Sequence, residues 1–148
     1  MLPPLAAQSW SEILLGVSQE NVELVRSVYA DPRGLTAGAS GRVAADAEFD
    51  FTAVYPDRPI MRGVEEFRRF RDDGPWSGSP IQFAPERFFD VDDDRVLVFV
   101  RVSVKGQESG AQLETQVAHE FTIRDHLVVR FKVYGNRDHG LEAAGLRE

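Results

Sequence analysis

Hydrophobic and polar residues alternate through most of the second half of the chain, which is the pattern of half-buried β-strands. Short turn sequences rich in aspartate or glycine divide this region into four segments. They are residues 81–89, 95–105, 111–124 and 127–134. Because connections this short join neighbouring strands, we predict an antiparallel meander.

Two segments carry their hydrophobic residues at helical spacing instead. In residues 18–30, Ser18 is expected to cap the helix and Pro32 to end it near Asp31. The apolar stripe of this helix consists of Val22, Val25, Val28 and Tyr29. Residues 62–74 form the second segment, with Val64, Phe67 and Phe70 on one side. We predict that this second helix covers a sheet.

Between the two helical segments, hydrophobic and polar side chains alternate again over residues 48–54, and this pattern predicts a further strand. Phe49 and Phe51 are the natural inward pair, which leaves Asp50 exposed or at the rim. A short helical turn is expected after Arg42. Residues 31–41 are rich in glycine and small side chains and read as a loop or a weak helix.

The segment 95–105 is apolar on both faces, because Leu97 and Phe99 join the alternating valines. A strand of this kind is covered on both faces. We expect helices on the concave side of the sheet only. The outer face is therefore expected to meet a second copy, forming a homodimer.

Length and composition indicate one globular domain. The chain has 148 residues, of which 43% are hydrophobic, and shows no repeat or linker. We place an N-terminal extension at residues 1–17 and a single domain at 18–148. The net charge of −7 disfavours nucleic acid and anionic membranes as partners. No secretion signal or spanning segment is evident, so a cytoplasmic location is expected.

The absence of cysteine excludes disulfides, thiol nucleophiles and cysteine-ligated metals. The three histidines do not form a zinc-like cluster, and the aspartates at 92–94 lack the spacing of a calcium loop. We therefore expect no metal and no cofactor.

Three stretches resemble the SnoaL-like family of the nuclear-transport-factor-2-like superfamily. They are SQENVELVRSVYA, DAEFDF with RPIMRGVEEFRRF, and QVAHEFTIRDHLVVRFKVYGNRDHGLEAAGL. The resemblance runs from about Ser18 to Leu146 and is most specific in the hairpin H-x-F-T-I-R-D. It implies an α+β, cone-like fold: a strongly curved antiparallel sheet wrapped around N-terminal helices, with an internal pocket. The superfamily includes ketosteroid isomerases, limonene-epoxide hydrolases, scytalone dehydratases, polyketide cyclases and non-enzymatic binders, so the fold alone does not define a reaction.

His119 is the leading candidate for a functional residue. Alternation places it on the apolar face of its strand with Val117, Phe121 and Ile123. By resemblance, it falls where ketosteroid isomerases have a carboxylic acid that donates a hydrogen bond to the substrate oxygen. An imidazole there can donate a hydrogen bond or act as an acid–base group near neutral pH. The alternative is a core histidine satisfied by a neighbouring polar group.

Arg101 and Asp50 are candidate catalytic partners of His119. Related epoxide hydrolases have an arginine at the position resembling Arg101, but their carboxylates correspond here to Ser103 and Val133, which cannot act as bases. The alternative for Arg101 is an edge arginine that reaches solvent. The resemblance places Phe51 at the isomerase base position, so Asp50 is a general base only with the register shifted by one residue.

A further group of residues is expected to line the ligand pocket. It comprises Tyr29, Phe51, Tyr55, Phe99, Phe121, Tyr134 and Asn136. Asn136 stands where many relatives have aspartate, and helix capping is the favoured alternative for it. Ordinary packing is the alternative for the aromatic residues.

Two functional hypotheses remain open. In the first, the protein binds a small apolar, carbonyl-bearing molecule and catalyses a cofactor-free isomerisation, cyclisation or dehydration. In the second, it is a ligand-binding or dimerisation module without turnover.

Overall fold

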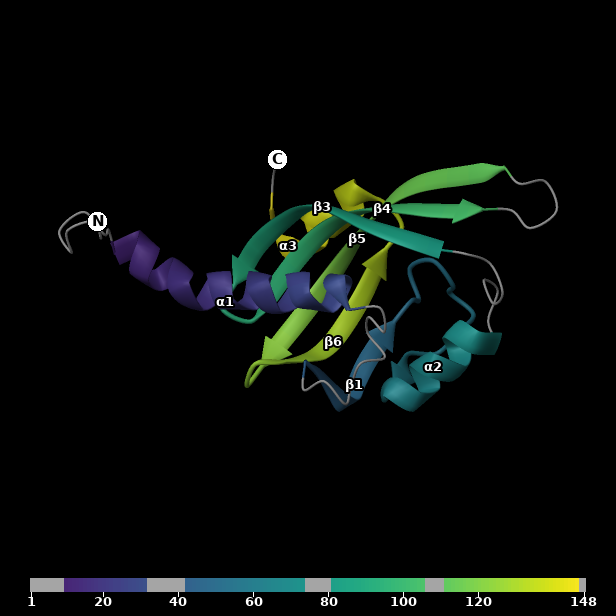
Figure 1. Cartoon of the computed structure of the whole chain (residues 1–148), viewed down its shortest axis with the longest axis horizontal. Helices are drawn as coiled ribbons and strands as arrows, with labels where there is room; N and C mark the ends of the chain where they lie inside the picture. Colours follow the sequence, from purple (N-terminus) through teal and green to yellow (C-terminus); the bar gives the residue numbers. More distant parts are fainter. Residues whose placement is uncertain (1–9, 32–41, 74–80, 106–110, 147–148) are drawn as a thin grey trace.

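The computed structural model describes residues 10–31, 42–73, 81–105 and 111–146 (Figure 1). Within these residues, one curved sheet has the strand order β2-β1-β6-β5-β4-β3. Its strands are β1 (Val43–Asp50), β2 (Met61–Arg62), β3 (Ile81–Asp92), β4 (Arg95–Lys105), β5 (Gln112–Arg124) and β6 (Leu127–Tyr134). The helices are α1 (Trp10–Ala30), α2 (Val64–Asp73) and α3 (Arg137–Ala144). This confirms the predicted α+β class and the curved sheet.

The predicted meander is confirmed. Strands β3, β4, β5 and β6 pair antiparallel in chain order, and β4 and β6 have the predicted bounds. Strand β1 pairs parallel with β6 and antiparallel with β2. None of the described helices is long and apolar enough to cross a membrane.

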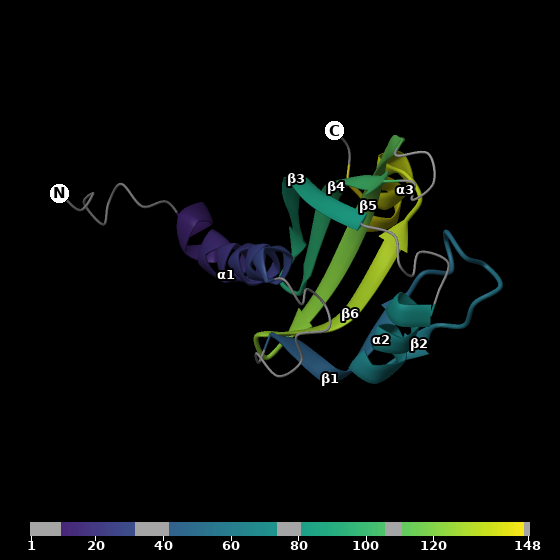
Figure 2. The same cartoon turned by 45° about the vertical axis from the view of Figure 1, so that its right-hand side comes forward.

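Helices lie on both faces of the sheet (Figures 1 and 2). We call the face covered by α1 and α2 the inner face, and the face covered by α3 the outer face. The inner core joins the even-numbered positions of β4 and the odd-numbered positions of β5 to Val25 and Val28 of α1. A smaller outer core joins Leu97, Phe99 and Tyr134 to α3.

The outer core corrects the expectation that helices cover the concave side only. Leu97 and Phe99 are fully buried within one chain because α3 packs against β4, β5 and β6. Gly140 permits this close approach, since a Cβ atom there would lie 2.5 Å from the Cβ of Ala118. The two apolar residues that suggested a homodimer are therefore covered without one.

Helix α1 begins before the predicted cap. It starts at Trp10 and places Ser18 inside the helix, so Ser18 is not the N-cap. Residues 10–17 contain no proline, and good helix formers there offset Gly16. The helix ends at Ala30, as Pro32 predicted.

Strand β1 is shifted toward the N-terminus relative to the prediction. It begins at Val43, with no helical turn after Arg42, and ends at Asp50. Residues 52–54 form a turn because the Asp50 carboxylate accepts hydrogen bonds from the Thr52 N–H (3.0 Å) and hydroxyl (2.6 Å). Helix α2 has the predicted apolar side. The loop predicted over 31–41 lies, apart from Asp31, outside the described residues.

Candidate functional site

His119 projects from β5 onto the inner face, as the alternation of its strand predicted. The residue lies opposite Val98 of β4 in the strand register, and only 5% of it is exposed. Four aromatic rings surround the imidazole, at distances measured between ring centroids: Phe131 at 4.8 Å, Phe83 at 5.9 Å, Tyr29 at 6.0 Å and Phe121 at 6.5 Å. The imidazole is therefore a polar group in an aromatic environment.

The hydrogen-bond partner of His119 comes from α1. The Tyr29 hydroxyl lies 2.7 Å from Nδ1 of His119, and the two rings are nearly parallel, with an interplanar angle of 5°. Burial of Val25 and Val28 holds α1 on the sheet. Earlier in α1, the side-chain amide of Asn21 donates a hydrogen bond to the backbone carbonyl of Asp93 at 2.8 Å, which ties the helix to the turn between β3 and β4. Tyr29 is thus held at His119 by the packing of the second half of α1.

Burial keeps both members of this pair neutral at pH 7. Desolvation lowers the pKa of His119 from 6.5 to about 3 and raises the pKa of Tyr29 well above its ordinary value. If Tyr29 donates to Nδ1, the Nε2–H of His119 remains as a donor; if Nδ1–H donates, the tyrosine O–H remains. Either arrangement leaves one neutral donor. Of the two roles expected for His119, burial favours hydrogen-bond donation over acid–base chemistry near neutral pH.

Asp50 lies on the outer face, away from His119. It is 3% exposed, so the expectation of an exposed or rim position is wrong. Its Oδ2 is 3.3 Å from Arg130 and 3.8 Å from Lys132, both on β6. Burial alone would raise the pKa of Asp50, but the Thr52 hydrogen bonds, Lys132 and Arg130 lower it below the ordinary value. This carboxylate stabilises a turn and does not reach the inner face.

Arg101 also lies on the outer face. Its side chain is 47% exposed and is 4.0 Å from Glu86 of β3. The structure therefore does not bring Arg101 or Asp50 together with His119, and the placement of Arg101 agrees with an arginine that reaches solvent.

The other predicted ligand-binding residues divide between the two faces. Phe121 contacts both His119 and Tyr29 on the inner face. Phe51 packs on Phe131, and Tyr55 packs on Phe70 of α2. Three residues belong to the outer face or its helix: Phe99, Tyr134 and Asn136. Asn136 caps α3 by accepting a hydrogen bond from the His139 N–H at 2.8 Å.

Sequence reasoning missed Phe83 and Asp90 of β3. Both share the inner face, since Phe83 pairs with Val102 and Asp90 with Val96. A register shift after Pro85 reverses the alternation of β3, which hid this assignment. Oδ1 of Asp90 is buried and has no hydrogen-bond partner among the described residues.

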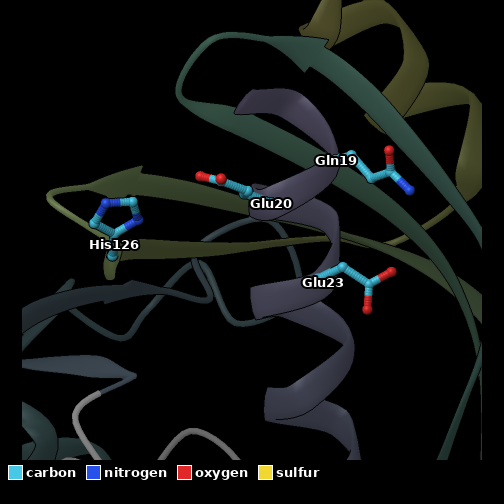
Figure 3. Close-up of a pocket in the computed structure, with 4 residues that line it drawn as sticks. All are labelled: Gln19, Glu20, Glu23 and His126. Atoms are coloured by element: carbon cyan, nitrogen blue, oxygen red, sulfur yellow. The ribbon is translucent and has the colours of Figure 1, made fainter. Parts of the chain in front are cut away.

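A shallow hollow lies elsewhere, beside the turn between β5 and β6. Gln19, Glu20, Glu23 and His126 line it, and Figure 3 shows the Glu20 carboxylate extending toward the His126 ring. His119 does not line this hollow. No group of three potential metal ligands occurs in the described part of the chain.

Comparison with known proteins shows which solved structures share this architecture. No protein-family profile matches the sequence, and no curated protein is detectably similar to it. Solved structures do match. The crystal structure of TerC with polyporic acid has a TM-score of 0.65 at 21% identity, over 85% of this chain and 98% of TerC. An NTF2-like protein of unknown function from Burkholderia pseudomallei has a TM-score of 0.63 at 19% identity, over 83% and 95% of the two chains.

A protein from Jannaschia described as a SnoaL-like polyketide cyclase matches as well, with a TM-score of 0.61 at 17% identity over 86% of this chain and 90% of the other. The chain has the NTF2-like fold. The resemblance seen in the sequence is thereby confirmed at the level of the fold. His119 and Tyr29 thus lie between the sheet and α1, on the inner face of this fold.

Proposed function

We propose that this protein binds a small, largely apolar organic molecule through an acceptor oxygen, such as a carbonyl, at His119 and Tyr29. The observation that carries the proposal is the buried hydrogen bond between these two side chains on an otherwise aromatic face. Small-molecule sites combine apolar walls with a few placed polar groups, which is the composition found here.

The chemistry of the pair supports a neutral ligand. A neutral donor stabilises a carbonyl oxygen without providing a full positive charge. TerC was crystallised with polyporic acid, so a protein with this fold holds an organic ligand in at least one case. A carbonyl compound is therefore the ligand class for this proposal.

The same donor supports cofactor-free catalysis beside a carbonyl. Hydrogen bonding to the carbonyl oxygen lowers the cost of forming an enol or enolate, the shared step of isomerisation and many cyclisations and dehydrations. Such a reaction also needs a base. Asp50, the base candidate from the sequence, is turned to the outer face, which favours the second candidate, binding without turnover. Among the described residues, the inner-face carboxylate of Asp90 is the remaining candidate base.

Acetophenone and ethylbenzene test the binding proposal as a matched pair with and without a carbonyl. We expect acetophenone to shift the NMR signals of Tyr29, His119 and Phe121. Its affinity should exceed that of ethylbenzene by roughly five- to tenfold, the value of one hydrogen bond. The double variant His119→Phe/Tyr29→Phe, which lacks both donors of the pair, should abolish this preference, whereas Tyr55→Phe should keep it. Equal binding of the two probes to the wild type would reject a donor site.

Hydrogen–deuterium exchange beside the carbonyl of acetophenone distinguishes enzyme from binder. Exchange accelerated by the wild type and not by His119→Phe would support catalysis at this site. Binding at His119 without accelerated exchange would support the non-catalytic candidate.

A further inference from the structure

The inner face continues past His119 as an exposed apolar surface. Successive cross-strand rows run from His119 and Val98, through Val117 and Val100, to the distal ends of β3, β4 and β5. The last two rows comprise Phe83, Val102 and Thr115, followed by Ile81, Val104 and Leu113. We call these six residues the apolar shelf. None of them is charged.

Exposure rises abruptly along these rows. Val100 and Val117 are buried, whereas Phe83 is 52% exposed and Leu113 is 65% exposed. At about 3.3 Å per residue of strand, Leu113 at the far end of the shelf lies about 20 Å along β5 from His119. Large exposed apolar side chains gathered on one surface are typical of a binding surface.

The shelf is continuous with the His119 site. The Phe83 ring leans toward the imidazole and lies 5.9 Å from it, between ring centroids. Phe121 lies on the side of His119 that faces away from the shelf, opposite Val96 in the strand register. The Tyr29 ring packs against it, with the two ring centroids 5.7 Å apart. A ligand bound at His119 can therefore extend toward Phe83, while Tyr29 and Phe121 fill the opposite direction.

We propose that the ligand is elongated and uncharged, with its acceptor oxygen at His119 and an apolar end on the shelf, where Phe83 selects for length. This inference rests on the proposed function. A small-molecule occupant is favoured over a second copy or another protein because the shelf is uncharged and begins in direct ring contact with the candidate donor.

Acetophenone and 4-phenylacetophenone provide the short and long probes, with biphenyl as the long probe without an acceptor. In the wild type, the added ring should increase affinity about tenfold, because part of its apolar area leaves water. The long ketone should also shift the methyl signals of Val102 and Leu113, which the short ketone leaves unchanged.

Two variants separate the shelf from the donor site. Phe83→Ala should remove most of the gain from the added ring and leave acetophenone affinity unchanged. Ile60→Ala is the matched control, since Ile60 is also an exposed hydrophobic residue (37%) and lies next to β2, at the opposite edge of the sheet. It should bind both ketones like the wild type.

Other outcomes would overturn the proposal in distinguishable ways. If both ketones shift His119 with equal affinity, and Phe83→Ala changes neither, the donor site stands and the shelf is not part of it. If no ketone shifts His119, the proposed function fails and the shelf proposal fails with it. Concentration-dependent dimerisation that is lost in Phe83→Ala would show that a second copy occupies the shelf.

Discussion

At the scale of single residues, the account depends on an imidazole that burial keeps neutral. Desolvation disfavours the charged form of His119, and no carboxylate among the described residues forms an ion pair with it. The Tyr29 hydroxyl satisfies one ring nitrogen. An unprotonated histidine inside the fold couples the stability of the protein to pH.

We predict that the free energy of unfolding decreases as the pH falls from 7 to 5. The unfolded chain takes up a proton at the ordinary histidine pKa of 6.5, whereas folded His119 stays neutral down to about pH 3. The unfolded state therefore binds more protons in this window, and acid favours it, by about 2 kcal/mol at pH 5.

Denaturant titrations of the wild type and His119→Asn at pH 7, 6 and 5 measure this effect. Asparagine cannot be protonated, so the variant should lose most of the pH dependence. The pKa values of Asp50 and Asp92 are lowered from 3.8 in the folded protein. These two carboxylates therefore change the free energy of unfolding mainly below about pH 4, outside this window. An equal pH dependence in both proteins would contradict a neutral, buried His119.

Residue-scale prediction from the sequence succeeded where the alternation was regular. The orientation of His119 followed from the unbroken period of β5. The burial of Asp50 could not be predicted, because its partners Arg130 and Lys132 lie on a strand 80 residues later that pairs parallel with β1. Local patterns carry no information on such pairs.

At the scale of secondary-structure elements, the docking of α3 depends on one glycine. A Cβ atom on Gly140 would lie 2.5 Å from Ala118 Cβ and 3.4 Å from Leu97 Cδ1. We predict that Gly140→Ala destabilises the protein by about 1–3 kcal/mol through overpacking. Thermal unfolding provides the measurement.

Gly135→Ala is the matched control, because its Cβ would meet Val54 Cγ1 at an ordinary 3.6 Å. Adding Ala118→Gly to Gly140→Ala should restore part of the lost stability. If Gly140→Ala is no worse than the control, the helix does not approach the sheet as closely as described.

The backbone of the turn between β5 and β6 is strained, because both of its residues adopt a conformation that favours glycine. Asp125 and His126 both have positive φ, at 50° and 64°, as a two-residue turn between antiparallel strands requires. We predict that His126→Gly raises stability by up to about 1 kcal/mol and that His126→Val lowers it. Chemical denaturation compares the two variants. Equal stabilities would contradict this backbone conformation.

The element boundaries show where sequence patterns suffice. Strands β4 and β6 had the predicted bounds because clear turn residues flank a regular period. The outer core was missed because a local pattern does not tell which face of the sheet α3 covers, and the close fit of α3 on Leu97 depends on the missing side chain of Gly140.

At the scale of the whole molecule, the curved sheet has an inner face lined by aromatic residues around His119 and an outer face that carries charged residues. Beyond α3, that outer face carries ion pairs such as Arg62–Glu48 at 3.0 Å. The homodimer through this face stays a prediction, and its contacts would be polar. We expect sedimentation velocity to show a dimer at low salt that weakens at high salt. A monomer under both conditions would contradict it.

The most direct test of the account is the protonation state of His119 in the folded protein. Long-range ¹H–¹⁵N NMR spectra of the imidazole, assigned with His119→Asn and recorded from pH 5 to 8, report it. We predict a neutral ring in one tautomer throughout, with Nδ1 in a hydrogen bond that Tyr29→Phe removes. A ring that takes up a proton near pH 6.5, or that ignores Tyr29→Phe, would contradict the proposed donor pair.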